Sequence, residues 1–151
     1  MIKTNPFLNE FSEVLKSEGF LRKKRTWYLR GDDVVVVLNL QSSDFEKKYY
    51  INFGVWLKSL GEDEFPSENK CHIQSRLTSL FNEEASLIDR ACRIVDPGLG
   101  DFSDFLAFAS KKVVPFCRDC LSLDSLKNKI ERGEFNNSLI FKELKLKLGL
   151  I

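Results

Sequence analysis

The stretch from residue 26 to residue 57 constrains the fold most, because three extended runs rich in apolar residues follow one another with turn residues between them. The runs are residues 26–30 (TWYLR), 34–41 (VVVVLNLQ) and 49–57 (YYINFGVWL). In the two longer runs, apolar residues recur at the two-residue period of a β-strand. The Gly-Asp-Asp sequence at 31–33 suits a tight hairpin turn between the first two runs. We therefore predict that the three runs form an antiparallel meander.

The two faces of the predicted strands differ in composition. One face is apolar along the whole of both longer runs: Val34, Val36, Leu38, Leu40, Tyr49, Ile51, Phe53, Val55 and Leu57. The other face starts apolar at Val35 and Val37 and then becomes polar. An antiparallel pair in a suitable register would gather four side chains of this second face on one surface: Asn39, Gln41, Asn52 and Trp56.

The polar part of the second face requires an explanation, because amides in the middle of strong strands are disfavoured unless something hydrogen-bonds them. In one interpretation, the C-terminal third of the chain covers this face and satisfies the amides internally. In the other, the face is exposed and binds a partner. The sequence leaves both interpretations open. The candidate partner-binding residues are Trp27, Tyr28, Arg30, Asn39, Gln41, Asn52, Trp56, His72 and Arg76.

Helical patterns flank the predicted sheet. Asn5-Pro6 is a typical helix start and Gly19 a typical stop, with an apolar stripe between them. From Asp101 onward, apolar residues spaced by three and four predict a core helix, which Pro115 must end or kink. Two shorter helical patterns follow it. The C-terminal third is therefore predicted to be helical.

The segments between these regions carry weaker signals. Residues 59–69 (SLGEDEFPSEN) are rich in turn formers and acids, which predicts an exposed loop. Residues 72–77 fit a fourth strand, although residues 76–81 also fit a short helix. We predict one α+β domain over residues 1–151, with an N-terminal helix, an antiparallel sheet of three to five strands and a helical C-terminal third.

Composition limits the classes of function. The chain has 151 residues, of which 43% are hydrophobic, which is enough for one sizeable core. Lys and Arg number 23 against 22 Asp and Glu, so the net charge of +1 gives no global attraction to nucleic acid or to an anionic membrane. No apolar run approaches the roughly 20 residues of a membrane span, and the N-terminus lacks the apolar segment of a secretory signal. We expect a cytoplasmic protein without a membrane partner.

The four cysteines raise the question of a metal site. Cys117 and Cys120 have the spacing of a zinc knuckle, and Cys71-His72 adds two potential ligands. Both cysteines of the knuckle-like pair fall on or just after the apolar side of a predicted helix, where cysteine acts as a small hydrophobe. We therefore predict reduced thiols packed in the core, with no metal and no other cofactor.

Signals for catalysis and for nucleic-acid binding are weak. His72 is the single histidine, and no nucleophile or phosphate-loop signature accompanies it, so we assign no catalytic residue. The basic run from Arg22 to Arg25 precedes Trp27 and Tyr28, a mixture found in single-strand nucleic-acid binders. The same charges also protect a sheet edge from pairing with another chain. We do not expect a nucleic-acid partner.

Several segments spread over most of the chain match the pattern of a known family. They are Gly19-Phe20 with the basic run, Thr26–Tyr28, Leu38–Gln41, Tyr50–Val55, Cys71–Leu77 and Val114–Phe116. In these segments the chain resembles a bacterial domain of unknown function. The resemblance implies a cytoplasmic bacterial protein and transfers no catalytic residue. Small single-domain families of this type resemble, by analogy alone, the immunity proteins of bacterial toxin systems.

The leading functional expectation is a non-enzymatic protein-binding module, above all an immunity-like protein that neutralises a partner toxin, or a related bacterial regulatory protein. The alternative is a small enzyme or nucleic-acid-binding domain with a pocket built around His72, Arg76 and the strand amides. Geometry separates the two. A cleft on which these groups converge favours the alternative, whereas a flat or convex patch favours a protein partner.

Overall fold

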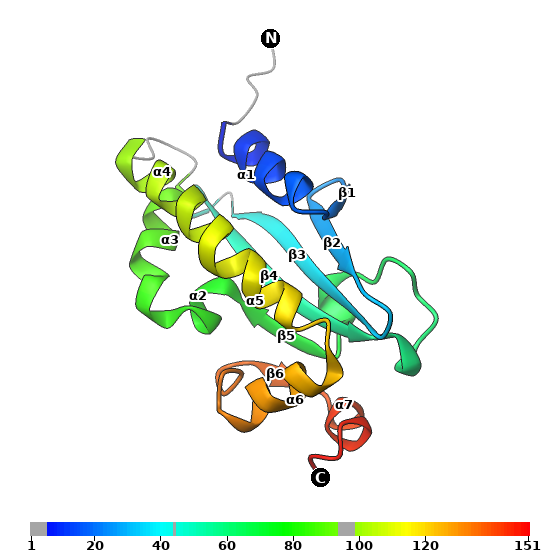
Figure 1. The fold of residues 1–151 in the computed structure, drawn as a ribbon. Helices are drawn as coiled ribbons and strands as arrows, with labels where there is room; N and C mark the ends of the chain where they lie inside the picture. The colour runs from blue at the N-terminus through cyan, green and yellow to red at the C-terminus, as the bar shows by residue number, and fades with distance from the viewer. Residues whose placement is uncertain (1–5, 44, 94–98) are drawn as a thin grey trace.

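The computed structural model describes residues 6–43, 45–93 and 99–151, which form a six-stranded antiparallel sheet with helices packed against it (Figure 1). The strands are β1 (Leu21–Lys23), β2 (Thr26–Arg30), β3 (Val34–Ser43), β4 (Lys48–Leu57), β5 (Ile73–Arg76) and β6 (Leu139–Ile140). The helices are α1 (Pro6–Ser17), α2 (Leu77–Leu80), α3 (Ala85–Ala91), α4 (Leu99–Phe108), α5 (Val114–Asp119), α6 (Leu123–Glu131) and α7 (Lys142–Lys147). Asn5, the expected helix start, lies outside the described residues.

The strands are ordered β1-β2-β3-β4-β5-β6, and every neighbouring pair is antiparallel. The predicted α+β class and the meander are confirmed, but the predicted range of three to five strands is wrong. The extra strands are the two shortest, β1 with three residues and β6 with two. Segments this short show no two-residue period. Both interpretations of residues 72–81 hold in part, because β5 ends at Arg76 and α2 begins at Leu77.

Helices cover the first face of the sheet and form the main core with it. Phe7 of α1 stacks on Tyr49 of β4, with 5.6 Å between ring centroids, and on Phe105 of α4, with 5.4 Å. Phe53 of β4 contacts the ring of Phe116 from α5 edge-on at 5.8 Å. The apolar face that the two-residue period predicted is therefore the face on which the N-terminal helix and the long C-terminal helix pack.

The long helix does not end at Pro115. α4 and α5 run as one rod across the sheet in Figure 1, joined by a five-residue π-helical turn at Ala109–Val113. Pro115 stands in the first turn of α5, directly after the π-helical turn. The residues before Pro115 are themselves helical, so its missing N–H removes one backbone hydrogen bond from the rod, and the wider π-helical turn directly precedes this point. The predicted end of the helix at Pro115 is therefore not observed, and a π-helical turn stands directly before the proline instead.

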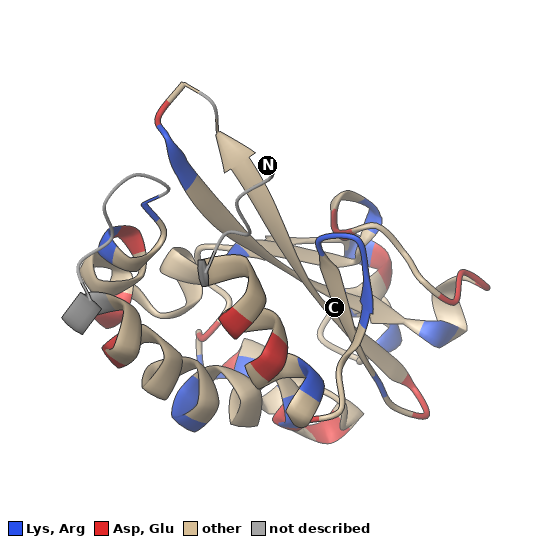
Figure 2. Cartoon of the chain, turned by 90° about the horizontal axis from the view of Figure 1, so that it is seen from above, with Lys and Arg blue, Asp and Glu red and all other residues tan. Residues whose placement is uncertain are grey.

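Charges are kept away from the long central strands (Figure 2). β3 carries no Lys, Arg, Asp or Glu, and β4 carries only Lys48. The basic run forms the edge strand β1 and its turn, where Lys24 has a positive φ of 57° and its carbonyl accepts a hydrogen bond from Nε of Arg22. Charged residues on an edge strand hinder pairing with another chain, which is the simpler of the two explanations for this run.

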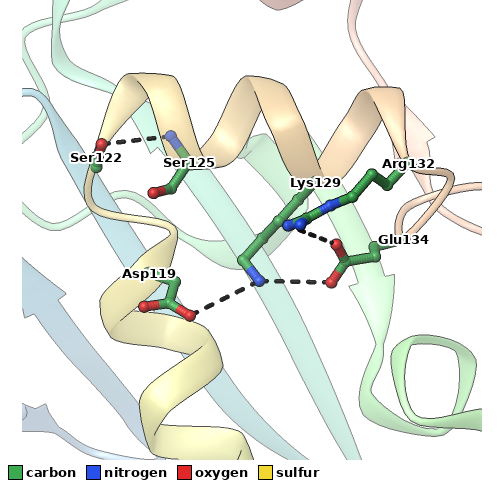
Figure 3. A network of polar contacts seen from close by, with 6 residues as sticks. All are labelled: Asp119, Ser122, Ser125, Lys129, Arg132 and Glu134. Atoms are coloured by element: carbon green, nitrogen blue, oxygen red, sulfur yellow. Dashed lines mark hydrogen bonds and ion pairs between the residues drawn. The ribbon is translucent and has the colours of Figure 1, made fainter.

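A buried lysine holds the helices after α5 in place (Figure 3). Lys129 of α6 is only 7% exposed, and its ammonium lies 3.9 Å from a carboxylate oxygen of Asp119 and 3.4 Å from one of Glu134. The same ammonium sits 4.3 Å from the ring centroid of Phe116. A buried charge needs such partners to offset its desolvation. Lys129 therefore links α5, α6 and the turn after α6.

Candidate binding face

The second face of the sheet divides into two halves. In the covered half, the segment 58–71 folds back over the strands. Its Phe65 and Cys71 pack against a small apolar cluster of strand residues: Tyr28, Val35, Val37 and Trp56. In the open half, the same face of the sheet carries polar side chains from β2 to β5. We use the terms covered half and open half for these two regions.

The covering segment 58–71 is held down by aromatic and cationic contacts. The ring of Phe65 meets Tyr28 edge-on at 5.2 Å, and the cations of Lys23 and Arg30 lie 3.6 Å and 5.0 Å from the Phe65 ring centroid. The hydroxyl of Tyr28 donates to the carbonyl of Phe65 at 3.5 Å. The prediction of an exposed loop at 59–69 is therefore wrong for its apolar residues, because Phe65 and the buried Pro66 pack against the sheet.

Gly54 allows the covering segment to approach the sheet. A Cβ at this position would lie 2.7 Å from Sγ of Cys71 and 2.9 Å from its Cβ, which no side chain tolerates. Burial beside Gly54 raises the pKa of the Cys71 thiol to about 12, with smaller contributions from Glu68 and Asp63. The thiol is thus neutral, and it fills the space that the missing side chain leaves.

A ladder of side-chain hydrogen bonds crosses the open half. The amide nitrogen of Asn52 donates to Oδ1 of Asn39 at 3.2 Å and to Oε1 of Gln41 at 3.0 Å. The amide nitrogen of Asn39 in turn donates to Oγ1 of Thr26 at 3.0 Å. The backbone register explains the ladder, because Thr26 pairs with Asn39, and Asn39 with Asn52. The amides thus satisfy one another, and the helices that pack on the first face are not needed to satisfy them.

The ladder continues into a cationic and aromatic stack. Asn52 pairs with Arg76 of β5, and the guanidinium of Arg76 lies 3.8 Å from the ring centroid of Tyr50. The ammonium of Lys48 lies 4.6 Å from the same centroid. A hydrogen bond to Glu46, helped by partial burial, raises the pKa of the Tyr50 hydroxyl, although the positive charge of Lys48 opposes the shift. Tyr50 is therefore protonated at neutral pH.

His72 lies away from the open half. Its Nδ1 accepts a hydrogen bond from the backbone N–H of Leu57 at 2.9 Å, and its ring stacks on Trp56 with 4.4 Å between centroids. Burial lowers the pKa of His72, and the carboxylate of Glu143 opposes the shift. His72 borders a groove of about 380 Å³ to which Arg76 contributes nothing. Arg76 instead lines a small hollow with Tyr50, so the groove at His72 does not bring together the His72, Arg76 and strand amides that the alternative function requires.

Trp27 does not belong to the candidate set. It pairs with Leu38 on the first face, is fully buried, and donates from Nε1 to Oγ of Ser12 in α1 at 3.2 Å. Its neighbours Tyr28 and Arg30 lie on the second face, where the covering segment contacts them. Adjacent residues of a strand point to opposite faces, so Trp27 and Tyr28 could never share one surface.

Apart from Trp27, the structure separates the candidate residues into two groups. Tyr28, Arg30 and Trp56 contact or lie beneath the covering segment, and His72 stacks on Trp56. The members that lie in the open half are Asn39, Gln41, Asn52 and Arg76. Thr26 and Tyr50 also belong to the open half and were missed in the sequence. Tyr50 lies two residues before Asn52 on β4, and Thr26 pairs with Asn39 across the sheet. The alternation of side chains along a strand was sufficient to place Tyr50 on this face.

The described residues contain no group of three or more His, Cys, Asp or Glu side chains able to hold a metal ion. Cys117 and Cys120 are fully buried in the main core, whereas Cys71 lies on the other face of the sheet. Burial raises the pKa of the Cys120 thiol to about 12. Among the helices of the described residues, none has the length and apolar character needed to cross a membrane.

Together these features define a small α+β protein, with a six-stranded antiparallel meander that is backed by helices on one face and divided into a covered and an open half on the other. The chain belongs to the family described as Domain of unknown function (DUF4304), whose sequence model matches residues 11–94. The predicted membership of a family of unknown function is confirmed. The matched region holds all the residues of the open half on β2 to β5. No curated protein and no solved structure matches the chain.

Proposed function

We propose that this protein is a cytoplasmic, non-enzymatic protein-binding module and that the open half is its binding surface. The observation that carries the proposal is the amide ladder, which is satisfied within the sheet and runs from Asn52, only 6% exposed, to the half-buried Asn39 and the exposed Gln41. A hydrogen-bonded row of amides keeps its geometry before a partner arrives, so little conformational entropy is lost on binding. The four free, buried cysteines suit a reducing compartment.

The charged residues beside the ladder indicate the chemistry of the partner. Arg76 is exposed and held flat on Tyr50, and Lys48 approaches the same ring. Arginine and tyrosine are enriched among the residues that dominate binding energy in protein interfaces. The guanidinium presents several donors to an incoming carboxylate. We therefore propose a partner whose surface offers carboxylates to Arg76 and hydrogen-bonding groups to Gln41.

Substitution of Arg76 tests this proposal. Arg76→Ala should weaken the partner by about 2 kcal/mol, or roughly thirtyfold in Kd, while circular dichroism and the denaturation midpoint stay close to wild type. The partner is first isolated by affinity capture with wild-type protein, and Kd values are then measured by calorimetry. Arg132→Ala is the matched control, because Arg132 is also exposed but lies at the end of α6 and forms a surface ion pair with Glu134. Equal affinities for the two folded variants would refute the open half as the binding surface.

A narrower form of the proposal is that the partner is a toxin, which this protein neutralises by occluding it. It is supported by the analogy between small single-domain families and the immunity proteins of bacterial toxin systems. Co-expression with the product of the neighbouring gene tests it. Growth should be rescued by wild-type protein and by Arg132→Ala, but not by Arg76→Ala. If the neighbouring gene product does not impair growth, the narrower proposal fails for that gene product. The broader proposal of a protein-binding surface is then tested by the calorimetry alone.

A further inference from the structure

A groove separate from the open half lies where the end of β4, the start of β5 and the start of α7 meet. Its walls are Trp56, Leu60, Lys70, His72, Phe141 and Glu143, and its volume is about 380 Å³. This volume falls within the range of small-molecule sites, which is about 300 to 1,000 Å³. We call it the aromatic groove.

Three rings shape the aromatic groove. Trp56 and His72 are stacked with 4.4 Å between centroids and an interplanar angle of 29°, and Phe141 meets His72 edge-on at 6.1 Å. Gly61 packs against the indole of Trp56, where a Cβ would overlap the ring. The rings are therefore fixed in place by packing. A planar ring is the group that best matches such walls.

Two donors accompany the rings. Nδ1 of His72 accepts the N–H of Leu57, so the neutral imidazole carries its proton on Nε2, which donates no hydrogen bond to the described residues. Nε1 of Trp56 is buried and likewise has no hydrogen-bond partner among them. A buried donor without a partner is rare and costly. A ligand acceptor in the groove would satisfy Nε2 of His72, whereas Nε1 of Trp56 has no accessible surface.

Charges of both signs complete the lining. Lys70 supplies an ammonium, and the carboxylate of Glu143 is close enough to His72 to act on its pKa. An anionic group is thus matched by Lys70 and the Nε2 proton of His72, and a cationic group by Glu143. We propose that the aromatic groove binds a small zwitterion with a planar ring, namely a free aromatic α-amino acid. This site goes beyond the proposed protein-binding function, because none of its lining residues belongs to the ladder.

A series of four compounds tests the ring and the two charges one at a time. L-Phenylalanine carries all three features, 3-phenylpropionate lacks the ammonium, 2-phenylethylamine lacks the carboxylate and L-alanine lacks the ring. Because His72 is the only histidine, its ring resonances in a two-dimensional NMR spectrum report on the groove without ambiguity. L-Phenylalanine should shift them saturably, each singly charged analogue should bind about tenfold more weakly, and L-alanine should cause no shift.

Matched variants assign the two charges. Lys70→Met should weaken the binding of L-phenylalanine about tenfold and leave that of 2-phenylethylamine unchanged. Glu143→Gln should weaken the binding of L-phenylalanine and 2-phenylethylamine and leave that of 3-phenylpropionate unchanged. Lys16→Met and Glu131→Gln, both exposed on helices away from the groove, are the controls and should bind like wild type. Equal binding of all three ring compounds, or no saturable shift with L-phenylalanine, overturns the proposal. Neither result depends on whether Arg76 binds a protein partner.

Discussion

The covered half and the open half of the second sheet face are built on the same strands, yet one is apolar and buried and the other is polar and hydrogen-bonded. On β3 the change occurs between Val37, which is fully buried, and Asn39, which is half-buried. The strand geometry is the same on both sides of this step. The difference is therefore made by what packs above each half.

The two halves satisfy their groups in different ways. In the covered half, apolar side chains lose contact with water beneath the segment 58–71, and the hydrophobic effect supplies the stabilisation. In the open half, Asn39 and Asn52 hydrogen-bond each other across the strands, so neither amide is left unpaired. One sheet face can thus contain a small apolar core and a hydrogen-bonded polar patch side by side, provided that each half has the side chains its environment requires.

The largest expected effect comes from exchanging the side-chain types of the two halves. Val37→Asn places an amide beneath the covering segment, opposite Gly54 and without a polar partner, and should lower the free energy of unfolding by about 2 to 4 kcal/mol. Asn39→Val in the open half should cost about 1 kcal/mol or less, because Asn52 keeps its bond to Gln41. Denaturant unfolding of both variants measures the difference. Equal losses would show that the two halves are not distinct environments.

A smaller effect is expected at the glycine on which the covering segment rests. Gly54→Ala brings a methyl group within 2.9 Å of Cys71 and should destabilise the protein by about 1 to 3 kcal/mol through overpacking. The double variant with Cys71→Ala should lose less than the sum of the two single losses, because the Sγ atom closest to the new methyl group is then gone. Additive losses in thermal or denaturant unfolding would contradict the close approach of segment and sheet.

The smallest expected effect concerns pH and the end of the covering segment at His72. Because burial lowers the folded-state pKa of His72 below its ordinary value of 6.5, the unfolded chain binds the proton more readily. His72 therefore contributes stability above about pH 6.5 that is lost as the pH falls through the lowered pKa. Glu143 opposes this loss, and Lys70 is the other charged group that lines the same groove.

The comparison that isolates this contribution uses His72→Asn, whose side-chain oxygen can accept the N–H of Leu57 but does not titrate. The free energy of unfolding is measured at about pH 7 and about pH 5.5 for both proteins, where carboxylate effects are common to the two. Wild type should lose more stability than the variant between these values. The same loss in both proteins would show that His72 is not the titrating group.

The sequence was sufficient for the parts of the fold that repeat locally. Alternation over residues 34–57 predicted two long strands and assigned their faces, and the register of β3 with β4 confirms it. The same alternation placed Asn39, Gln41 and Asn52 on one face. It also held the information that Trp27 belongs to the other face, since Trp27 and Tyr28 are adjacent. Helical spacing was enough to predict a helix before the strands in the sequence and helices after them.

Other features were decided by contacts between residues far apart in the chain. β6 has only two residues, and it forms because Ile140 pairs with Ile73 from a distant part of the sequence. Residues 59–69 were predicted to be an exposed loop from their acids and turn formers, yet Phe65 packs on Tyr28 and Gly54 leaves room for Cys71. No local period encodes such matches of shape.

By itself, the sequence determined the long strands, their faces and the amphipathic helices, because these depend on side-chain spacing over a few residues. Only the tertiary structure decided which half of the second face is covered and which is open. That choice depends on whether a distant segment offers apolar surface that fits, and the free energy of burying Val35, Val37 and Trp56 beneath it exists only once the chain has folded back. The amides of the open half are instead satisfied by hydrogen bonds across β2, β3 and β4.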